Sequence, residues 1–257
     1  MKVENSMSAK ISVTDLSLSY GDFEVLRKVN FVVGDGAVLV VIGGSGCGKS
    51  TLMKAMIGLI EPVSGSVSYG AANFTSAHHD ERVQLMRSFG VLYQGGALWT
   101  SMTLRENVAL PLEMFTDLRP REIRDFADYK LSLVGLENFG DFFPAELSGG
   151  MRKRAGLARA MALDPEILFL DEPSAGLDPL SSRRLDDLIL ELKESLGATF
   201  VVVTHVLPSI FAIADDAVFL DAEFKGVIAQ GSPKRLLQEG DEKVRRFLRR
   251  GGETDLL

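Results

Sequence analysis

The sequence predicts an α/β fold in which a parallel sheet forms the core, antiparallel strands precede it and a helical segment is inserted into it. Three patterns indicate this. An apolar run over residues 37–42 is followed by a glycine-rich turn and then by helical spacing. Apolar runs over 165–170 and 200–203 end in polar residues, and residues 96–160 are rich in helical patterns without a strand pattern. Short apolar runs bounded by turns are typical of buried parallel strands.

The first third of the chain supplies the antiparallel part. Residues 10–33 alternate between apolar and polar side chains, and Tyr20-Gly-Asp22 interrupts them with a turn. Helical spacing over 50–59 and a short strand over 66–69 follow the glycine-rich turn. A final strand hairpin is expected over 218–229, and a short basic amphipathic helix over 241–250. A solvated face or a dimer contact is favoured for that helix over a membrane surface.

The glycine-rich turn fits the phosphate-binding pattern G-x-x-x-x-G-K-[ST] without a mismatch. Glycines let the backbone approach an anion closely, and successive N–H groups and the helix dipole then point at the same place. Lys49 can reach the β- and γ-phosphates, and the Ser50 hydroxyl can ligate Mg²⁺. The segment therefore predicts a phosphate-loop NTPase core. The positions expected to contact the nucleotide are Gly43, Gly44, Ser45, Gly46, Cys47, Gly48, Lys49, Ser50 and Thr51.

Polar residues at the ends of the later strands are expected to complete a hydrolytic site. Asp171 and Glu172 close the apolar run at 165–170, so both should emerge at the ligand-binding edge of the sheet. Asp171 is expected to hold Mg²⁺, and Glu172 to polarise the attacking water. Gln94, at the end of a strand over 89–93, is expected to reach Mg²⁺ and that water. A lone histidine is usually structural, but the position of His205 at the same edge favours a functional role.

A second anion-binding helix start is predicted at Leu147-Ser-Gly-Gly. Ser148 is a good N-cap residue, and Gly149 and Gly150 leave the helix amides accessible. No other group in the chain is an obvious partner for this helix start. The turn from Ser174 to Asp178 then precedes an amphipathic helix over 181–196.

Composition excludes several classes of protein. The net charge of −7 argues against tight binding of nucleic acid, and the single cysteine excludes an internal disulfide framework. No apolar run reaches the length of a membrane span, and the first residues lack the apolar core of a signal peptide. We therefore expect a soluble protein in the cytoplasm that would meet a membrane only through a partner.

Three local features allow two interpretations each. His78 and His79 suggest a metal, but a solvated polar loop over 71–82 is favoured because no second His or Cys cluster accompanies them. Trp99, with its neighbours Leu98 and Met102, anchors a partner or packs inside. Tyr20 stacks on a base or, as the residues alone favour, lies in the core or an edge strand.

Together these motifs resemble the ATP-binding-cassette (ABC) ATPases over residues 10–235, with an inserted helical subdomain at about 96–160 and a short helix and tail over 236–257. The resemblance implies ATP and Mg²⁺ as ligands and a head-to-tail homodimer. It places ATP between Lys49 and Ser50 of one subunit and Ser148–Gly150 of the other, with Asp178 also at the nucleotide. It further implies that Tyr20 packs against adenine.

Narrower features resemble the ATPases of lipid-transport systems. These are Tyr93-Gln-Gly-Gly-Ala-Leu-Trp99, Met151 after the Leu-Ser-Gly-Gly motif, and the segment 221–229. The resemblance implies an integral membrane permease dimer, an MCE-domain lipid-binding protein and a small accessory subunit, at the cytoplasmic face of a bacterial inner membrane, as in the Mla phospholipid pathway. Val206 departs from the acidic or polar residue usual after the histidine.

Three other functions remain as alternatives. One is the ATPase subunit of an importer for amino acids or ions. Another is a soluble cassette acting on ribosomes or DNA-repair complexes, although such proteins usually carry two cassettes or a long coiled-coil insertion. A nucleotide-binding regulator without turnover is disfavoured by the presence of Glu172 and His205.

Overall fold

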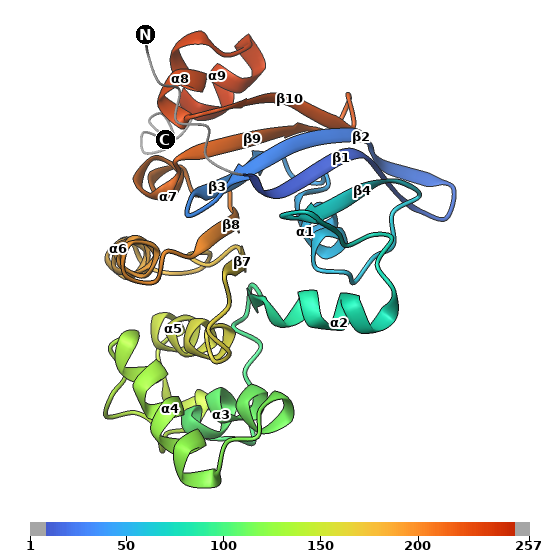
Figure 1. Ribbon diagram of the computed structural model, residues 1–257. Helices are drawn as coiled ribbons and strands as arrows, with labels where there is room; N and C mark the ends of the chain where they lie inside the picture. Colours follow the sequence, from blue (N-terminus) through green and yellow to red (C-terminus); the bar gives the residue numbers. More distant parts are fainter. Residues whose placement is uncertain (1–8, 250–257) are drawn as a thin grey trace, which may run out of the picture.

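The computed structural model describes residues 9–249, which form two sheets with helices around them (Figure 1). A four-stranded antiparallel sheet has the order β2-β1-β4-β5, and a six-stranded sheet has the order β10-β9-β3-β8-β7-β6. The first sheet consists of β1 (Ala9–Tyr20), β2 (Phe23–Gly34), β4 (Ser64–Tyr69) and β5 (Ala72–Asn73). The second consists of β3 (Val38–Gly43), β6 (Phe89–Leu92), β7 (Ile167–Asp171), β8 (Thr199–Val203), β9 (Asp216–Asp221) and β10 (Gly226–Gly231).

Five strands of the larger sheet run parallel, and β10 pairs antiparallel with β9 at one edge. Alternate side chains of the parallel strands enter two different cores. In β3, Val38, Val40 and Ile42 face one core while Leu39 and Val41 face the other. The predicted α/β fold with a parallel sheet and an antiparallel N-terminal part is confirmed.

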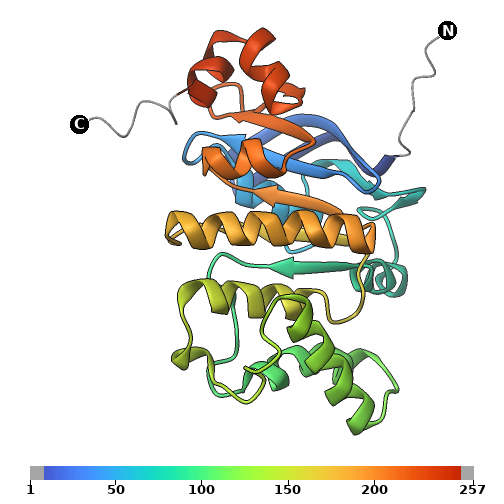
Figure 2. The ribbon, with the colours of Figure 1, turned by 90° about the vertical axis from the view of Figure 1, so that its left-hand side faces the viewer.

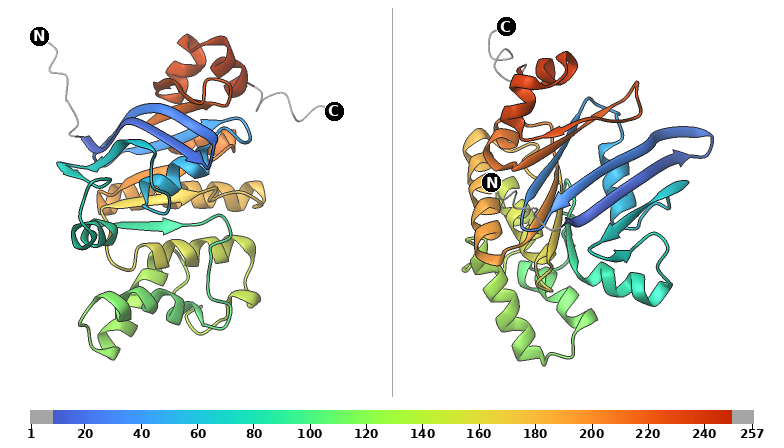
Figure 3. Two further views of the ribbon diagram at one scale, coloured as in Figure 1. Left: turned by 90° about the vertical axis from the view of Figure 1, so that its right-hand side faces the viewer. Right: turned by 45° about the horizontal axis from the view of Figure 1, so that its top comes forward.

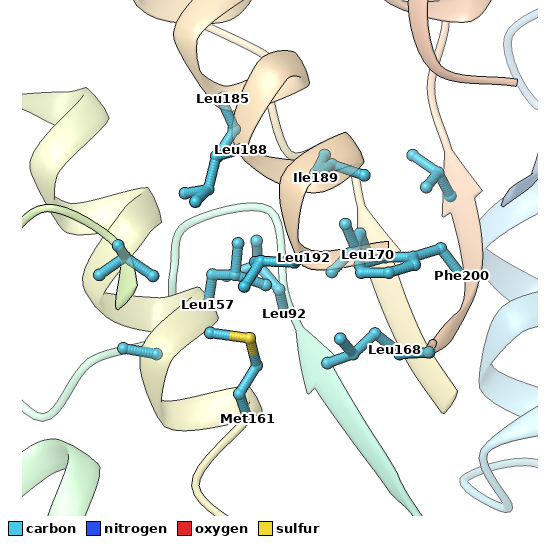
Figure 4. Packing of buried hydrophobic residues seen from close by; sticks show 14 of the residues in the cluster. Leu92, Leu157, Met161, Leu168, Leu170, Leu185, Leu188, Ile189, Leu192 and Phe200 are labelled. Carbon is cyan, nitrogen blue, oxygen red and sulfur yellow. The ribbon is translucent and has the colours of Figure 1, made fainter. Parts of the chain in front are cut away.

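Helices fill both faces of this sheet. The helix α1 (Lys49–Met56) packs between the two sheets. On the other face lie α5 (Gly149–Ala160), α6 (Pro179–Leu196) and α7 (Leu207–Ile213), as Figure 2 shows. The side chains that join them to the strands are shown in Figure 4: Leu92, Leu157, Met161, Leu168, Leu170, Leu185, Leu188, Ile189, Leu192 and Phe200.

The segment between β6 and β7 is helical, as predicted. It contains α3 (Leu104–Phe115), α4 (Pro120–Leu133), a 3₁₀ turn (Pro144–Glu146) and α5, and it forms the end of the molecule away from the antiparallel sheet (Figures 1 and 3). A proline within a helical pattern predicts a break, here at Pro111, but this prediction is wrong, because α3 continues through it. Leu104 and Val108 before the proline and Leu112 after it are all buried in one core, which holds the helix together.

Three short helices were not expected. Residues 71–82 are not one loop, since α2 (His79–Arg87) begins at the second histidine; it has no buried residue and therefore leaves no amphipathic pattern. The helix α7 follows His205, and α8 (Pro233–Glu239) begins after Ser232, whose hydroxyl accepts the N–H of Arg235. The predicted helix at 241–250 corresponds to α9 (Glu242–Arg249).

The predicted division into residues 10–235, an insertion at about 96–160 and a tail over 236–257 stays a prediction. Residues 250–257 of that tail lie outside the described residues. Within residues 9–249, no helix is both long enough and apolar enough to cross a bilayer.

We expect Gly90→Ala to destabilise the fold. A Cβ built at Gly90 would lie 1.9 Å from the carbonyl oxygen of Ala160, at the end of α5, so β6 and the helix would have to separate. The free energy of unfolding in urea should fall by about 1–3 kcal/mol, the usual cost of overpacking. Gly95→Ala is the control, because its Cβ would meet no atom within 4 Å. Equal stability of the two variants would contradict this packing.

Candidate nucleotide site

The loop between β3 and α1 has the backbone geometry of an anion cradle. All six residues of β3 are buried, and the loop leaves the strand at Gly43 with φ +147°. A Cβ at Gly43 would lie 2.3 Å from the carbonyl oxygen of Leu220, so only glycine fits between β3 and β9. Gly48, with φ +98°, precedes the first residue of α1. The two glycines place the loop amides and the helix start around one point.

The side chain of Lys49 folds back over this loop. Its Nζ donates hydrogen bonds to the carbonyl oxygens of Gly43 and Gly44, each at 2.9 Å. Cys47 is buried beneath it, with Sγ 3.8 Å from the ammonium group. Burial raises the pKa of the Cys47 thiol, which keeps it neutral and unreactive. The Lys49 ammonium group therefore lies within the loop, and the buried Cys47 side chain packs beneath the loop.

Ser50 and Asp171 face each other across the start of α1 and the end of β7. The Ser50 hydroxyl donates to Asp171 Oδ1 at 3.4 Å. Burial raises the pKa of Asp171, and the adjacent negative charge of Glu172 raises it further. A divalent cation at this place would relieve both effects, and hydroxyl and carboxylate oxygens are the ligands that Mg²⁺ prefers. The residues present therefore fit Mg²⁺ held jointly with phosphate oxygens.

Glu172 and His205 form a pair at the ends of β7 and β8. His205 Nδ1 and Glu172 Oε1 are 2.7 Å apart. The other carboxylate oxygen, Oε2, is buried and has no hydrogen-bond partner among residues 9–249. The backbone of Glu172 has φ +48°, an uncommon value for a residue with a Cβ. A strained, partly unsatisfied carboxylate is typical of a group held for a substrate.

The aromatic residue Tyr20 ends β1 at the mouth of a pocket of about 710 Å³ above the loop. Tyr20 is 52% exposed, and β1 lies between β2 and β4, so the interpretation favoured by the residues alone, a core or edge-strand tyrosine, is wrong. Gln94, exposed after β6, also lines the pocket. The remaining lining residues are Phe23, Val25, Gly43, Gly44, Ser45, Gly46, Gly48, Lys49, Ser50, Thr51, Glu172, His205 and Phe247.

Phe23 and Val25 of β2 line this pocket although they were not predicted to, and a third such residue is Phe247. Phe247 comes from α9, more than 190 residues after the loop, and its ring packs edge-on against Phe219 of β9 with centroids 5.2 Å apart. The expected helix over 241–250 includes this position, but nothing in the sequence indicated which surface the helix covers.

Four predicted site residues lie at the starts of α5 and α6, away from this pocket. Ser148 is exposed at the start of α5, where its hydroxyl accepts the N–H of Met151 at 3.3 Å, and neither it nor Gly149 and Gly150 lines the pocket. Asp178 caps α6 by accepting the N–H groups of Leu180 and Ser181, and hydrogen bonding from Ser181 lowers its pKa. Within one chain these residues do not join Lys49.

A family model described as "ABC transporter" matches residues 26–175. The chain belongs to this family. The probable ribonucleotide transport ATP-binding protein mkl of Mycobacterium tuberculosis is 40% identical over 94% of the chain and 67% of its own length. The intermembrane phospholipid transport system ATP-binding protein MlaF is 38% identical in Haemophilus influenzae and 36% in Escherichia coli K12, over 95–96% of the chain and 91% of each relative.

Solved cassettes share the fold. CbiO1 from Clostridium perfringens, part of the ABC transporter complex cbiONQ, is 27% identical with a TM-score of 0.83, over 97% of this chain and 100% of its own. A dimeric, post-hydrolysis structure of the cassette MJ0796 bound to ADP and Pi is 28% identical with a TM-score of 0.78, over 86% of this chain and 98% of its own. The chain is thus the ATP-binding subunit of an ABC transporter and an ATPase with the ABC ATPase fold.

The structure also shows how exposed Trp99 and its neighbours are and where His79 lies. Trp99 is 59% exposed, which favours the surface interpretation, while Leu98 and Met102 are half-buried. His79 begins α2, and no cluster of three or more His, Cys, Asp or Glu side chains suited to a metal occurs within residues 9–249.

A buried acid supports the turn that leads to Asp178. Asp186, on α6, is only 5% exposed and accepts a hydrogen bond from the hydroxyl of Ser209 on α7 at 2.8 Å. That hydroxyl also contacts Ser174 in the turn, at 3.4 Å. Burial raises the pKa of Asp186 to about 6. The turn is thus tied to both helices through the Ser209 hydroxyl.

The raised pKa predicts a pH-dependent stability. Because the folded chain holds the Asp186 proton more tightly than the unfolded chain, ionisation of Asp186 removes stability as the pH rises from about 4 to about 6. Asp186→Asn lacks this penalty, so relative to wild type it should gain about 2–3 kcal/mol between pH 4 and pH 7. Urea unfolding at both values measures the change. A pH-independent difference between Asp186→Asn and wild type would contradict the assignment.

Proposed function

We propose that the pocket binds ATP with Mg²⁺. Lys49 and the loop amides contact the phosphates, while Ser50 and Asp171, joined by Gln94, hold the metal. Tyr20 packs against adenine. The observation that carries the proposal is the convergence of Lys49, Ser50, Gln94 and Glu172 on one pocket above a glycine-built loop. The neighbouring carboxylates Asp171 and Glu172 supply the negative charge that a divalent cation balances.

Hydrolysis is assigned to the ends of β7 and β8. Glu172 polarises the attacking water through its buried, unsatisfied oxygen, and His205 fixes the carboxylate through the 2.7 Å contact. Gln94 orients the same water when Mg²⁺ is bound. A positioned carboxylate acting on water contributes about 10²–10⁴-fold to such reactions.

Two copies of the chain act together. The exposed helix start at Ser148–Gly150 lies outside the pocket of its own chain, so it is available to the γ-phosphate held by a second copy. Asp178 approaches the same nucleotide from the copy that supplies Ser148–Gly150. The dimeric state of the related cassette bound to ADP and Pi supports this arrangement.

The transported molecule is proposed to be a phospholipid. MlaF, named for intermembrane phospholipid transport, matches over 91% of its length, whereas mkl, named for ribonucleotide transport, matches over 67%. The chain would act at the cytoplasmic face of a bacterial inner membrane, bound to a permease dimer, with an MCE-domain protein and a small accessory subunit. The exposed Trp99 is a candidate contact for the permease.

Glu172→Gln tests the hydrolytic role. The variant should bind ATP as wild type does, while turnover falls about 10²–10⁴-fold because the amide cannot act as a base. Phosphate release measures turnover, and equilibrium dialysis measures binding. Glu166→Gln makes the same change near the opposite end of β7, where Glu166 contacts Lys10, and should leave turnover unchanged. Near-normal turnover by Glu172→Gln would refute the role.

Purification from membranes in mild detergent tests the transported molecule. A tagged chain should retain a permease, an MCE-domain protein and bound phospholipid, identified by mass spectrometry. Recovery of a solute permease with a solute-binding protein, or of a permease that carries ribonucleotides, would leave the ATPase assignment intact. It would contradict the proposal that the transported molecule is a phospholipid.

A further inference from the structure

The buried cation Lys153 lies beside the nucleotide pocket without lining it. It belongs to the second turn of α5 and is only 6% exposed. Its Nζ donates to two main-chain carbonyl oxygens, those of Gln94 and, at 2.9 Å, of Glu172. These carbonyls belong to segments 78 residues apart in the sequence, which follow the neighbouring strands β6 and β7.

The main chain at Glu172 and the main chain after Gln94 each need a contact to fix their conformation, for different reasons. Glu172 adopts a left-handed φ of +48°, and its N–H is held by the carbonyl of Val203 at 2.8 Å. Lys153 holds the carbonyl of the same residue, on the other side of its Cα. The segment after Gln94 contains two successive glycines and therefore has little conformational preference of its own.

The helix α5 contacts the Gln94 segment at further points. Arg159 donates to the carbonyl oxygens of Gly96 and Ala97, at 3.0 and 2.7 Å. A Cβ at Gly156 would lie 3.0 Å from the Gly96 oxygen and 2.7 Å from Leu92, so the segment lies directly on the helix. Among these contacts of α5, that of Lys153 also reaches Glu172.

We propose that Lys153 is a positioning residue, which fixes the Gln94 and Glu172 main chains relative to each other through one ammonium group. The proposal rests on the proposed roles of Gln94 and Glu172 in hydrolysis. The three donors of one compact cation can satisfy carbonyls from two directions at once. Because α5 begins at Ser148–Gly150, a displacement of that motif would move both carbonyls together.

Lys153→Met tests the role because methionine fills a similar volume without donors. The variant should fold, since the Glu172 carbonyl also accepts the Ala175 N–H at 3.2 Å and Gln94 is exposed to water. We expect kcat to fall about 100-fold, the cost of a misplacement of about 1 Å. The dissociation constant of a non-hydrolysable ATP analogue, measured by calorimetry, should stay within about threefold.

The matched control is Arg154→Met on the same helix. Arg154 also donates to two carbonyls, those of Val134 and Gly135, but on the side away from the pocket. Its kcat should stay within about threefold of wild type even if its melting temperature falls as much as that of Lys153→Met.

Hydrogen exchange separates this proposal from the assignment of hydrolysis. Amides of residues 95–97 should exchange faster in Lys153→Met and remain unchanged in Arg154→Met, whether or not the protein turns over ATP. Unchanged exchange there, a kcat for Lys153→Met within threefold of wild type, or equal losses in the two variants would overturn the proposal. If Glu172→Gln kept normal turnover while residues 95–97 still exchanged faster in Lys153→Met, only the hydrolytic role of Glu172 would be overturned.

Discussion

The close approach of the β3 loop to β9 is the constraint on which the rest of the site depends. Gly43 leaves no room for a side chain beside the Leu220 carbonyl, and this fixes where the loop amides and Lys49 lie relative to the sheet. The parallel strands β6, β7 and β8 then end at the same edge, which carries Gln94, Glu172 and His205 to the pocket. Residues more than 100 positions apart meet because the carboxyl ends of parallel strands share an edge.

Charge at this edge is unbalanced in the chain alone. Asp171 and Glu172 lie side by side at the end of a buried strand, and the pKa of Asp171 is raised mainly by burial. Two of the nearby cations contact carbonyl oxygens and not these carboxylates: Lys49 contacts those of the loop, and Lys153 contacts those of Gln94 and Glu172. A nucleotide with its metal brings both the positive charge for the carboxylates and the anion for the loop, so each part of the ligand satisfies a different part of the site.

The sequence predicted most of the sheet and the residues of the pocket floor, because buried strands and the phosphate loop have strong local patterns. It failed where the signal was tertiary. The helix α2 buries no side chain, so no periodicity marks it, and Pro111 is held within α3 by burial on both sides. Phe247 reaches the pocket only because α9 packs on Phe219, and the contact of Lys153 with two carbonyls depends on how α5 lies against two strand ends.

Ser148 does not line the pocket of its own chain, and a single chain does not explain this. We therefore propose that two copies share each ATP. Sedimentation velocity of Glu172→Gln tests this most directly, with and without Mg²⁺ and ATP, alone and combined with Ser148→Arg. The account predicts a dimer only when Mg²⁺ and ATP are present. With Ser148→Arg added, it predicts a monomer that still binds one ATP at Lys49. A nucleotide-dependent dimer that persists after Ser148→Arg, or loss of ATP from the monomer, would contradict it.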